Sequence, residues 1–257
     1  MDLVRLHVVH HIAYLEFNQP ESLNAMTMPM AQEMSHAVTQ INDNKDVRVA
    51  VLRGSGRAFS SGGSFDFLQA RATQSDADNH QIMLEFYQRY LSIKQLHVPS
   101  IAAIHGYAVG AAFCLALACD MRVATTNAQM GVNFAKIGLS SGMAGLYSLF
   151  HTIGPTHAAD LFFTGRLVNS EEAYRMGILN RIFEPTCWDD EIKSLATSIA
   201  ANSTHAIKLM KAGLRQVPHM SIQQVFELEA QGQVSCFKHQ ELKEGLQAIR
   251  DKRTPRY

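Results

Sequence analysis

Apolar residues along this chain recur at two spacings, which separate expected strands from expected helices. Four short runs rich in β-branched residues predict strands; they span residues 11–17, 47–52, 100–104 and 121–124. A glycine-bearing loop or a helical pattern follows each later run. Units of strand, loop and helix in this order favour an α/β fold with a largely parallel, buried sheet.

A helical spacing begins at Thr27, a residue suited to cap a helix N-terminus, with Pro29 in the first turn. Apolar side chains then recur at three- and four-residue steps and predict one buried helix face: Met26, Met30, Met34, Val38 and Ile41. Further helices are predicted over residues 171–176, where Gly177 is a C-cap signal, and over residues 189–201 and 222–249.

One long apolar run and one polar segment carry further predictions. The longest apolar run, residues 107–119, is too short to span a bilayer and predicts a buried helix, so we expect no membrane partner. The polar segment 69–80 follows a glycine-rich turn, where lids often occur. It therefore predicts a mobile loop.

Composition narrows the class of protein. The 257 residues include 23 Lys and Arg against 23 Asp and Glu, which argues against a nucleic-acid partner. The four cysteines form no CxxC pair and show no zinc spacing, so we expect no metal site and a reducing compartment. No apolar run of signal-peptide length opens the chain, and a cytoplasmic location is expected.

Two glycine-bearing loops are the chemically interesting segments. They are residues 56–64 (GRAFSSGGS) and 105–113 (HGYAVGAAF), and the second opens into an apolar helix. Small residues let backbone N–H groups approach a ligand, and two such groups aimed at one point form an oxyanion hole. Neither loop matches a dinucleotide fingerprint or a P-loop.

These loops also carry a resemblance to a known family. GRAFSSGGSF, IAAIHGYAVGAAFCLALACDMRVA and AQMGVNFAKIGLSSGM resemble the crotonase (enoyl-CoA hydratase/isomerase) superfamily, as do FFTGRLVNSEEAYRMGILNRI and GLQAIRDKR. The resemblance implies a spiral core of ββα units over residues 1–195 and a helical trimerisation region over residues 196–257. It also implies homotrimers or hexamers, and an acyl thioester on coenzyme A or an acyl-carrier protein. No cofactor is expected apart from that CoA or phosphopantetheine.

The resemblance further assigns candidate site residues. The oxyanion hole falls on the backbone N–H groups of Gly63 and Ala111. The loop that cradles pantetheine falls on Ser22, Asn24, Ala25 and Met26. Arg57 and Lys252 match basic positions that contact nucleotide phosphates in some relatives, although each is equally well a solvated surface charge.

The pattern departs from the family where a hydratase needs its two glutamates. Cys114 stands at the first of these positions and Phe134 at the second, and neither residue does carboxylate acid–base work at neutral pH. The loop 138–143, which carries an isomerase glutamate in other relatives, has no carboxylate either. Plain hydration and isomerisation are both disfavoured on this basis.

Decarboxylation needs an oxyanion hole but no carboxylate base, because departing CO₂ leaves its electrons on the enolate. FSSGG and VNFAKIGLSSGM resemble the crotonase-like decarboxylases of polyketide β-branching, which act on a methylglutaconyl group on a carrier protein. Arg71 could then hold a substrate carboxylate, and His80 or His239 could donate the proton. Those decarboxylases use a lysine and a C-terminal histidine, and this chain has neither at the matching positions.

Three alternatives remain open at this stage. The first is a hydratase or isomerase with a relocated acid–base group. The second is a catalytically inactive thioester-binding protein, and the third is a thioester hydrolase that uses Cys114. His105, beside the second loop, is expected to be structural.

Overall fold

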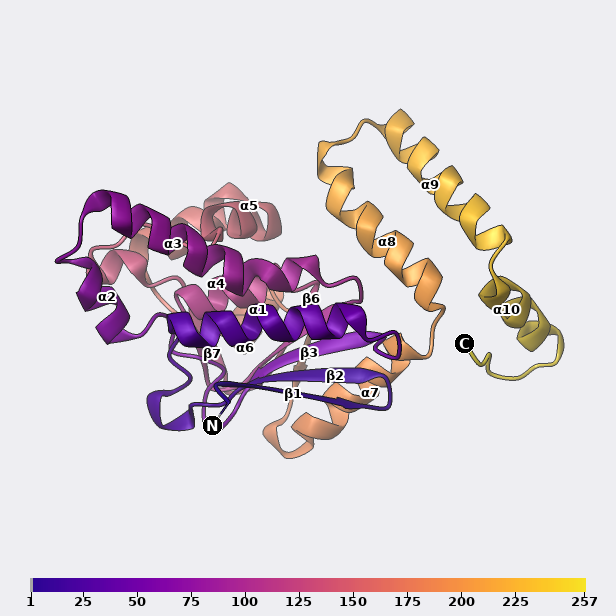
Figure 1. Cartoon of the computed structure of the whole chain (residues 1–257), viewed down its shortest axis with the longest axis horizontal. Helices are drawn as coiled ribbons and strands as arrows, with labels where there is room; N and C mark the ends of the chain where they lie inside the picture. The colour runs from indigo at the N-terminus through magenta and orange to yellow at the C-terminus, as the bar shows by residue number, and fades with distance from the viewer. Residues whose placement is uncertain (1) are drawn as a thin grey trace.

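The computed structural model of the chain describes residues 2–257 and shows a mixed α/β fold with two sheets (Figure 1). The larger sheet has the order β1-β2-β3-β4-β6-β9; only β1 pairs antiparallel with its neighbour. Its strands are β1 (Val4–Val9), β2 (Ile12–Phe17), β3 (Val49–Gly54), β4 (Ser100–Ile104), β6 (Met121–Thr125) and β9 (Arg181–Phe183). The smaller sheet contains β5 (Tyr107–Val109), β7 (Gln129–Gly131) and β8 (Val168–Asn169). The expected α/β class with a largely parallel sheet is confirmed.

The described residues also form ten α-helices, of which the last three extend away from the sheets (Figure 1). They are α1 (Met28–Asp43), α2 (Phe65–Arg71), α3 (Asp76–Tyr90), α4 (Ala111–Ala118), α5 (Gly145–Thr164), α6 (Ser170–Arg175), α7 (Trp188–Ala200), α8 (Thr204–Gln216), α9 (Ile222–Phe237) and α10 (Gln240–Arg250). Short 3₁₀ turns occupy Pro20–Ser22, Leu91–Gln95, Phe134–Ile137, Pro185–Cys187 and Val217–His219. No helix in residues 2–257 combines the length and hydrophobicity needed to cross a bilayer.

The larger sheet is buried on both faces. Along β3, Ala50 and Leu52 face the main core, whereas Val49 and Val51 face a second core that α7 covers. This alternation follows from the two-residue period of a strand. Burial on both sides explains why the central strands are apolar runs rather than alternating ones.

Local signals predicted the first helix and its cap correctly. The Thr27 hydroxyl accepts a hydrogen bond from the Met30 N–H at 3.3 Å, and α1 begins at the next residue. The expected apolar stripe is buried: Met26, Met30, Met34, Val38 and Ile41 are each at most 2% exposed. The helix predicted before Gly177 is confirmed as α6, and Gly177 has a φ of 81°, which suits glycine.

The expected mobile loop at residues 69–80 is wrong. The segment contains the end of α2, a four-residue turn and the first residues of α3. Ser75 caps α3 and accepts a hydrogen bond from the Asp78 N–H at 3.2 Å. The segment is polar because acidic residues favour the N-terminus of an exposed helix, as Asp76 and Asp78 do here.

Two other predictions need correction. The run 107–119 begins as strand β5 and becomes helical only at Ala111. The single helix expected over residues 222–249 is interrupted at residues 238–239, because His239 caps a separate helix, α10. β1 and α8 were not predicted. The expected division after residue 195 falls within α7 and stays a prediction.

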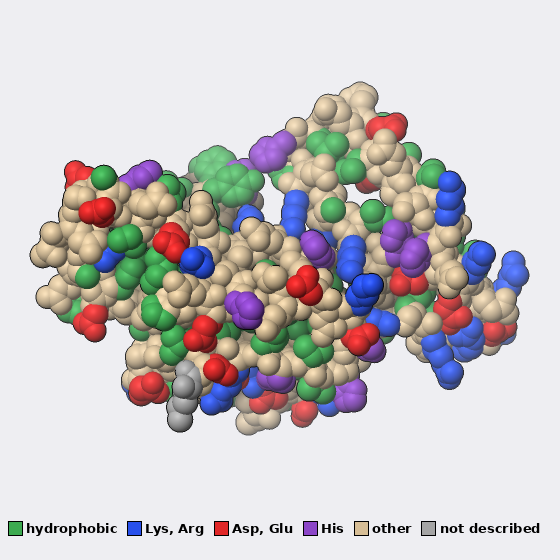
Figure 2. Space-filling view, viewed as in Figure 1, with side chains coloured by type: hydrophobic (Ala, Val, Ile, Leu, Met, Phe, Trp, Pro, Cys, Tyr) green, Lys and Arg blue, Asp and Glu red, His purple; other side chains and the backbone are tan. Residues whose placement is uncertain are grey.

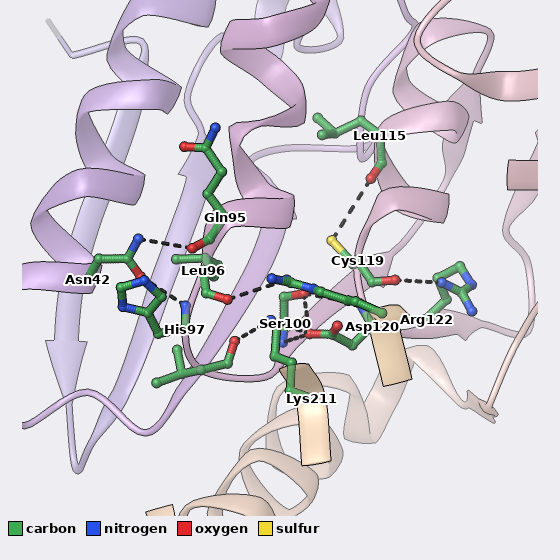
Figure 3. A network of polar contacts seen from close by, with 12 residues as sticks. Asn42, Gln95, Leu96, His97, Ser100, Leu115, Cys119, Asp120, Arg122 and Lys211 are labelled. Atoms are coloured by element: carbon green, nitrogen blue, oxygen red, sulfur yellow. Dashed lines mark hydrogen bonds and ion pairs between the residues drawn. The ribbon is translucent and has the colours of Figure 1, made fainter. Parts of the chain in front are cut away.

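A buried lysine joins the C-terminal helices to the core (Figure 3). Lys211 on α8 is 6% exposed, and its ammonium lies 2.6 Å from Asp120 Oδ2 and also donates to the Val98 carbonyl. The same Asp120 oxygen accepts hydrogen bonds from the Ser100 N–H and hydroxyl at 2.7 and 2.8 Å. Burial lowers the pKa of Lys211 and the charge of Asp120 opposes that effect. Removing the ammonium would leave the Asp120 carboxylate without its counter-charge and the Val98 carbonyl without this donor.

We therefore expect Lys211→Ala to lower the free energy of unfolding by about 3 kcal/mol, the usual cost of breaking a buried charged pair. Lys208→Ala is the matched control, since Lys208 lies exposed on the same helix and its loss should change stability by less than about 0.5 kcal/mol. Urea unfolding of the two variants measures the difference. Equal urea midpoints for the two variants would contradict a stabilising role of the buried Lys211–Asp120 pair.

Candidate active site

The two glycine-bearing loops of the sequence lie side by side. The Phe59 N–H donates to the His105 carbonyl at 2.8 Å, and the Ser60 N–H donates to the Tyr107 carbonyl at 3.0 Å. The Val109 N–H returns a hydrogen bond to the Ser60 carbonyl at 3.2 Å. Backbone hydrogen bonds therefore fix the first loop against the strand that precedes α4.

Gly62 makes this close approach possible. Its φ is +91°, and a β-carbon built there would lie 2.5 Å from the Val109 carbonyl oxygen and 3.6 Å from the Ala111 nitrogen. Both the backbone conformation and the lack of space exclude a larger residue. Gly62 thus brings Gly63, the next residue, close to the first residue of α4.

The N–H groups of Gly63 and Ala111 have no acceptor within residues 2–257. Neighbouring N–H groups are occupied: Gly62 donates to the Ser60 hydroxyl at 3.1 Å, and Gly110 donates to the Gly131 carbonyl at 2.8 Å. Ala111 opens α4, where the first N–H groups of a helix have no partner inside the helix and the dipole is positive. Two N–H groups without an acceptor therefore lie at the junction of the two loops, where the resemblance predicts an oxyanion hole.

Backbone hydrogen bonds hold the loop 22–26 beside Gly62 and Ser64. The Met26 N–H donates to the Gly62 carbonyl at 2.7 Å, and the Ser64 N–H donates to the Met26 carbonyl at 3.0 Å. Asn24 is fully buried, and its side-chain amide donates to the Ser55 and Ala58 carbonyls, both at 2.9 Å. The Asn24 side chain therefore fixes the loop 22–26 to the first glycine-bearing loop from inside the protein.

Two of the predicted contact residues in this loop cannot present their side chains to a ligand. Asn24 and Met26 are both 0% exposed. Ser22 is exposed and Ala25 is half-buried. Any contact of this loop with a thioester thus comes from its backbone or from Ser22 and Ala25.

The two positions expected to lack a carboxylate lie next to the candidate hole. Cys114 stands one turn after Ala111 on α4 and is fully buried. The Phe134 ring lies 3.7 Å from the place of a β-carbon on Gly110, the residue that precedes α4. Burial raises the pKa of the Cys114 thiol to about 12, so the thiol stays protonated at neutral pH. A thioester hydrolase that uses Cys114 as nucleophile is not supported.

Tyr87 and Ser141 are polar residues near Cys114 that sequence reasoning missed. A β-carbon on Gly142 would lie 2.6 Å from the Tyr87 hydroxyl oxygen. A β-carbon on Gly145 would lie 2.7 Å from Cys114 Sγ and 2.8 Å from Ser141 Oγ. Tyr87 lies on α3, 55 positions before Gly142 in the sequence, and no local pattern connects the two.

Arg71 ends α2 and is only partly used by the protein. Its guanidinium carbon lies 5.0 Å from the centre of the Phe67 ring. Two of its nitrogens, Nε and Nη1, are buried without a hydrogen-bond partner. The Asn79 side chain on α3 donates to the Arg71 carbonyl at 2.7 Å and holds the end of α2.

The remaining predicted residues are dispersed. His80 is exposed on α3, and Arg57 is exposed beside the first loop. His239 caps α10 and stacks on His205 with 4.2 Å between ring centres. Lys252 lies exposed in the segment that follows α10. α10 lies at the opposite end of the protomer from α2 (Figure 1), so neither His239 nor Lys252 joins Gly63 within one protomer.

His105 has the structural role expected for it. Its Nε2 lies 3.0 Å from the Gly56 carbonyl oxygen, and its ring packs 6.4 Å from Trp188. Burial lowers its pKa. A neutral imidazole that links the first loop to α7 fits this position. Within residues 2–257, no three His, Cys, Asp or Glu side chains are placed to hold a metal ion.

Comparisons with known proteins agree on the family. A family model described as enoyl-CoA hydratase/isomerase matches residues 8–257. Crotonyl-CoA hydratase of Syntrophomonas wolfei is 30% identical over 243 residues, which are 94% of this chain and 92% of that protein. (E)-benzylidenesuccinyl-CoA hydratase of Thauera aromatica is 32% identical over 208 residues, which are 81% of this chain and 80% of that protein.

A solved structure extends the agreement to the fold. The crystal structure of an enoyl-CoA hydratase from Polaromonas sp. JS666 matches with a TM-score of 0.94 at 26% identity, over 99% of each chain. The chain therefore belongs to the enoyl-CoA hydratase/isomerase family of the crotonase superfamily.

Proposed function

We propose that this chain is an enzyme of acyl-CoA thioesters that stabilises a thioester enolate between the N–H groups of Gly63 and Ala111. The observation that carries the proposal is the pair of N–H groups without an acceptor at the junction of two hydrogen-bonded loops. Fixed donors of this kind stabilise the oxyanion at no cost of reorganisation during the reaction.

The reaction that the relatives favour is hydration of an enoyl thioester, or its isomerisation, with a relocated acid–base group. The two matched relatives cited above are both named hydratases. Cys114 and Phe134 cannot supply the carboxylates, so the proton must pass through another group. The proposed enzyme therefore uses the same enolate as hydratases with two glutamates. It differs from them in which residues act as acid and base.

Decarboxylation of a methylglutaconyl-type thioester, carried by CoA or a carrier protein, is the second candidate. Arg71 favours it, because two buried guanidinium nitrogens without a partner suit a substrate carboxylate. The Thauera relative is named for a benzylidenesuccinyl thioester, an acyl group of the dicarboxylic type. An apolar site at Cys114 and Phe134 also favours loss of a carboxylate's charge.

The deciding experiment offers the enzyme crotonyl-CoA and 3-methylglutaconyl-CoA in separate reactions, with mass spectrometry of the products. Gain of one water by either thioester is the result expected from hydration, and an isomer of unchanged mass that chromatography separates from the substrate is the result expected from isomerisation. Loss of CO₂ that depends on the enzyme would establish the second. No change in any thioester, together with tight binding of CoA, would mean that the chain only binds thioesters.

Ala111→Pro tests the oxyanion hole directly. Proline is tolerated at the first position of a helix, where its missing N–H has no helical partner, so the variant should fold. Loss of this donor should lower kcat by a factor of about 10²–10³. Steady-state kinetics on whichever thioester the wild type converts measures the effect.

The matched control is Gln240→Pro, which places proline at the first position of α10, far from the loops. It should keep wild-type kinetics. Circular dichroism confirms that both variants fold. A folded Ala111→Pro variant with unchanged kcat would remove Ala111 from the oxyanion hole.

We also propose that copies of this chain assemble as a homotrimer or hexamer. Apolar side chains stand exposed on α5 and on the C-terminal helices (Figure 2). On α5 they line one groove and include Phe163 at 83% exposed and Leu146 at 61%. Leu214 on α8 and Ile249 on α10 are each 75% exposed. Contiguous apolar surface of this kind marks a protein–protein interface.

Light scattering during size-exclusion chromatography should accordingly give three or six times the mass of one chain. Dilution over a hundredfold range should leave that mass unchanged, because an interface that covers several apolar helix faces is stable. A monodisperse monomer at every concentration would contradict the proposed assembly.

A further inference from the structure

Three side chains with exchangeable protons gather around residues 141–145, the segment that leads into α5. They are Tyr87 from α3, Cys114 from α4 and Ser141 from the segment itself. None of them is a carboxylate, and none has a role in forming the oxyanion hole. Their position relative to the hole decides what they can do.

The cluster lies one helical turn from the candidate hole. Cys114 follows Ala111 by three residues on α4, so the two share one side of that helix. The Cys114 sulfur and the Ser141 hydroxyl both lie against Gly145, at 2.7 and 2.8 Å from the place of its β-carbon.

Two hydroxyl groups in this cluster have no partner in the protein. Ser141 Oγ is buried without a hydrogen bond. The Tyr87 hydroxyl makes no hydrogen bond with any of residues 2–257, and it lies 2.6 Å from the place of a β-carbon on Gly142. By contrast, Tyr90 on the same helix donates to the Thr27 carbonyl at 2.9 Å. A buried hydroxyl group without a partner, such as that of Ser141, is uncommon in folded proteins and points to a ligand. Tyr87 is only partly buried, so its free hydroxyl beside this cluster can be reached by the same ligand.

The ring of Tyr87 is held by the core rather than by polar contacts. It packs edge-on against Phe86 with 6.4 Å between ring centres, and Phe86 is 2% exposed. Burial raises the pKa of Tyr87, so the phenol remains protonated at neutral pH. It is therefore available as a proton donor.

Both reactions end with protonation of a thioester enolate: hydration requires the proton at the α-carbon, whereas decarboxylation of a methylglutaconyl-type thioester leaves a dienolate that takes it at the α- or γ-carbon. We propose that the Tyr87 hydroxyl supplies this proton and that Ser141 positions the acyl group or a water molecule beside it. This inference rests on the proposed function, since it requires an enolate held by Gly63 and Ala111.

The step balances without any further reagent. The O–H bond of Tyr87 breaks, and the enolate electron pair forms the new C–H bond while the thioester carbonyl is restored. The resulting phenolate takes a proton from water. Cys114 is the less suitable donor, because its pKa is raised to about 12 and its side chain is fully buried.

Tyr87→Phe tests the proposal, with the reaction run in D₂O on the thioester that the wild type converts. kcat should fall by a factor of about 10²–10⁴, the usual contribution of a general acid, while KM changes by less than about threefold. NMR of the product should show deuterium on one face of the α-carbon for the wild type and on both faces for Tyr87→Phe. A merely structural role would not change this stereochemistry.

Gly142→Ala gives an independent test that keeps the hydroxyl. Its methyl group would lie 2.6 Å from the Tyr87 oxygen and displace it, so the same loss of kcat and of stereospecificity is expected. Gly232→Ala is the matched control, because no atom lies within 4 Å of the added methyl group. Tyr174→Phe, an exposed tyrosine on α6, controls for loss of a phenol.

The outcomes separate the inference from the function on which it rests. Stereospecific deuteration at wild-type rate by folded Tyr87→Phe and Gly142→Ala would overturn the role of Tyr87 alone. A wild type that converts neither thioester would overturn the proposed function, and the role of Tyr87 with it. Should Tyr87→Phe fail to fold, Gly142→Ala decides.

Discussion

The close approach of two backbone segments at Gly62 is the constraint on which the rest of the site depends. A carbonyl oxygen occupies the space that any side chain at position 62 would need. Three backbone hydrogen bonds between residues 59–60 and residues 105–109 then fix the two loops together. The N–H groups of Gly63 and Ala111, the donors of the proposed oxyanion hole, would therefore hold their places before a substrate arrives, which is how preorganised donors lower a barrier. Asn24 extends the same lock to the loop 22–26.

With the hole fixed by backbone atoms, the side chains around it are free to differ. Cys114 and Phe134 make the space beside α4 apolar and leave it without a carboxylate. The enolate chemistry survives this change, because backbone N–H groups stabilise the oxyanion whichever side chains surround it. Without carboxylates at positions 114 and 134, proton transfer requires another group. The unpartnered hydroxyl groups of Tyr87 and Ser141 are therefore the feature that distinguishes a working site from an inactive one.

The sequence predicted those parts of the fold that depend on local signals. Thr27 marks the start of α1, and residues 100–104 form β4 as expected. The helix break at His239 was missed, since a histidine cap lacks the strong signal of serine or aspartate. Polar residues 69–80 were taken for a loop because exposed helix ends and loops have similar compositions.

Contacts between residues distant in the chain could not be predicted in the same way. Lys211 and Asp120 are 91 positions apart, and nothing near either residue indicates the pair. Tyr87 meets Gly142 only because α3 packs over the core beside α4 and α5. The resemblance to the family pointed to the two glycine-bearing loops, which the structure joins by hydrogen bonds, but no motif that carries it includes Tyr87 on α3, the proposed proton donor.

The separation of Lys252 from the loops connects the assembly to the choice of substrate. Arg57 lies beside the first loop, whereas Lys252 follows α10 at the far end of the same protomer from α2 (Figure 1). If both residues contact the phosphates of one CoA molecule, they must come from two copies of the chain. A carrier-protein substrate has no adenosine phosphates and would make no such demand. Loss of CoA affinity on Lys252→Ala in the assembled protein, but not in a monomeric variant, would therefore link the proposed trimer to a free CoA thioester rather than to a carrier protein.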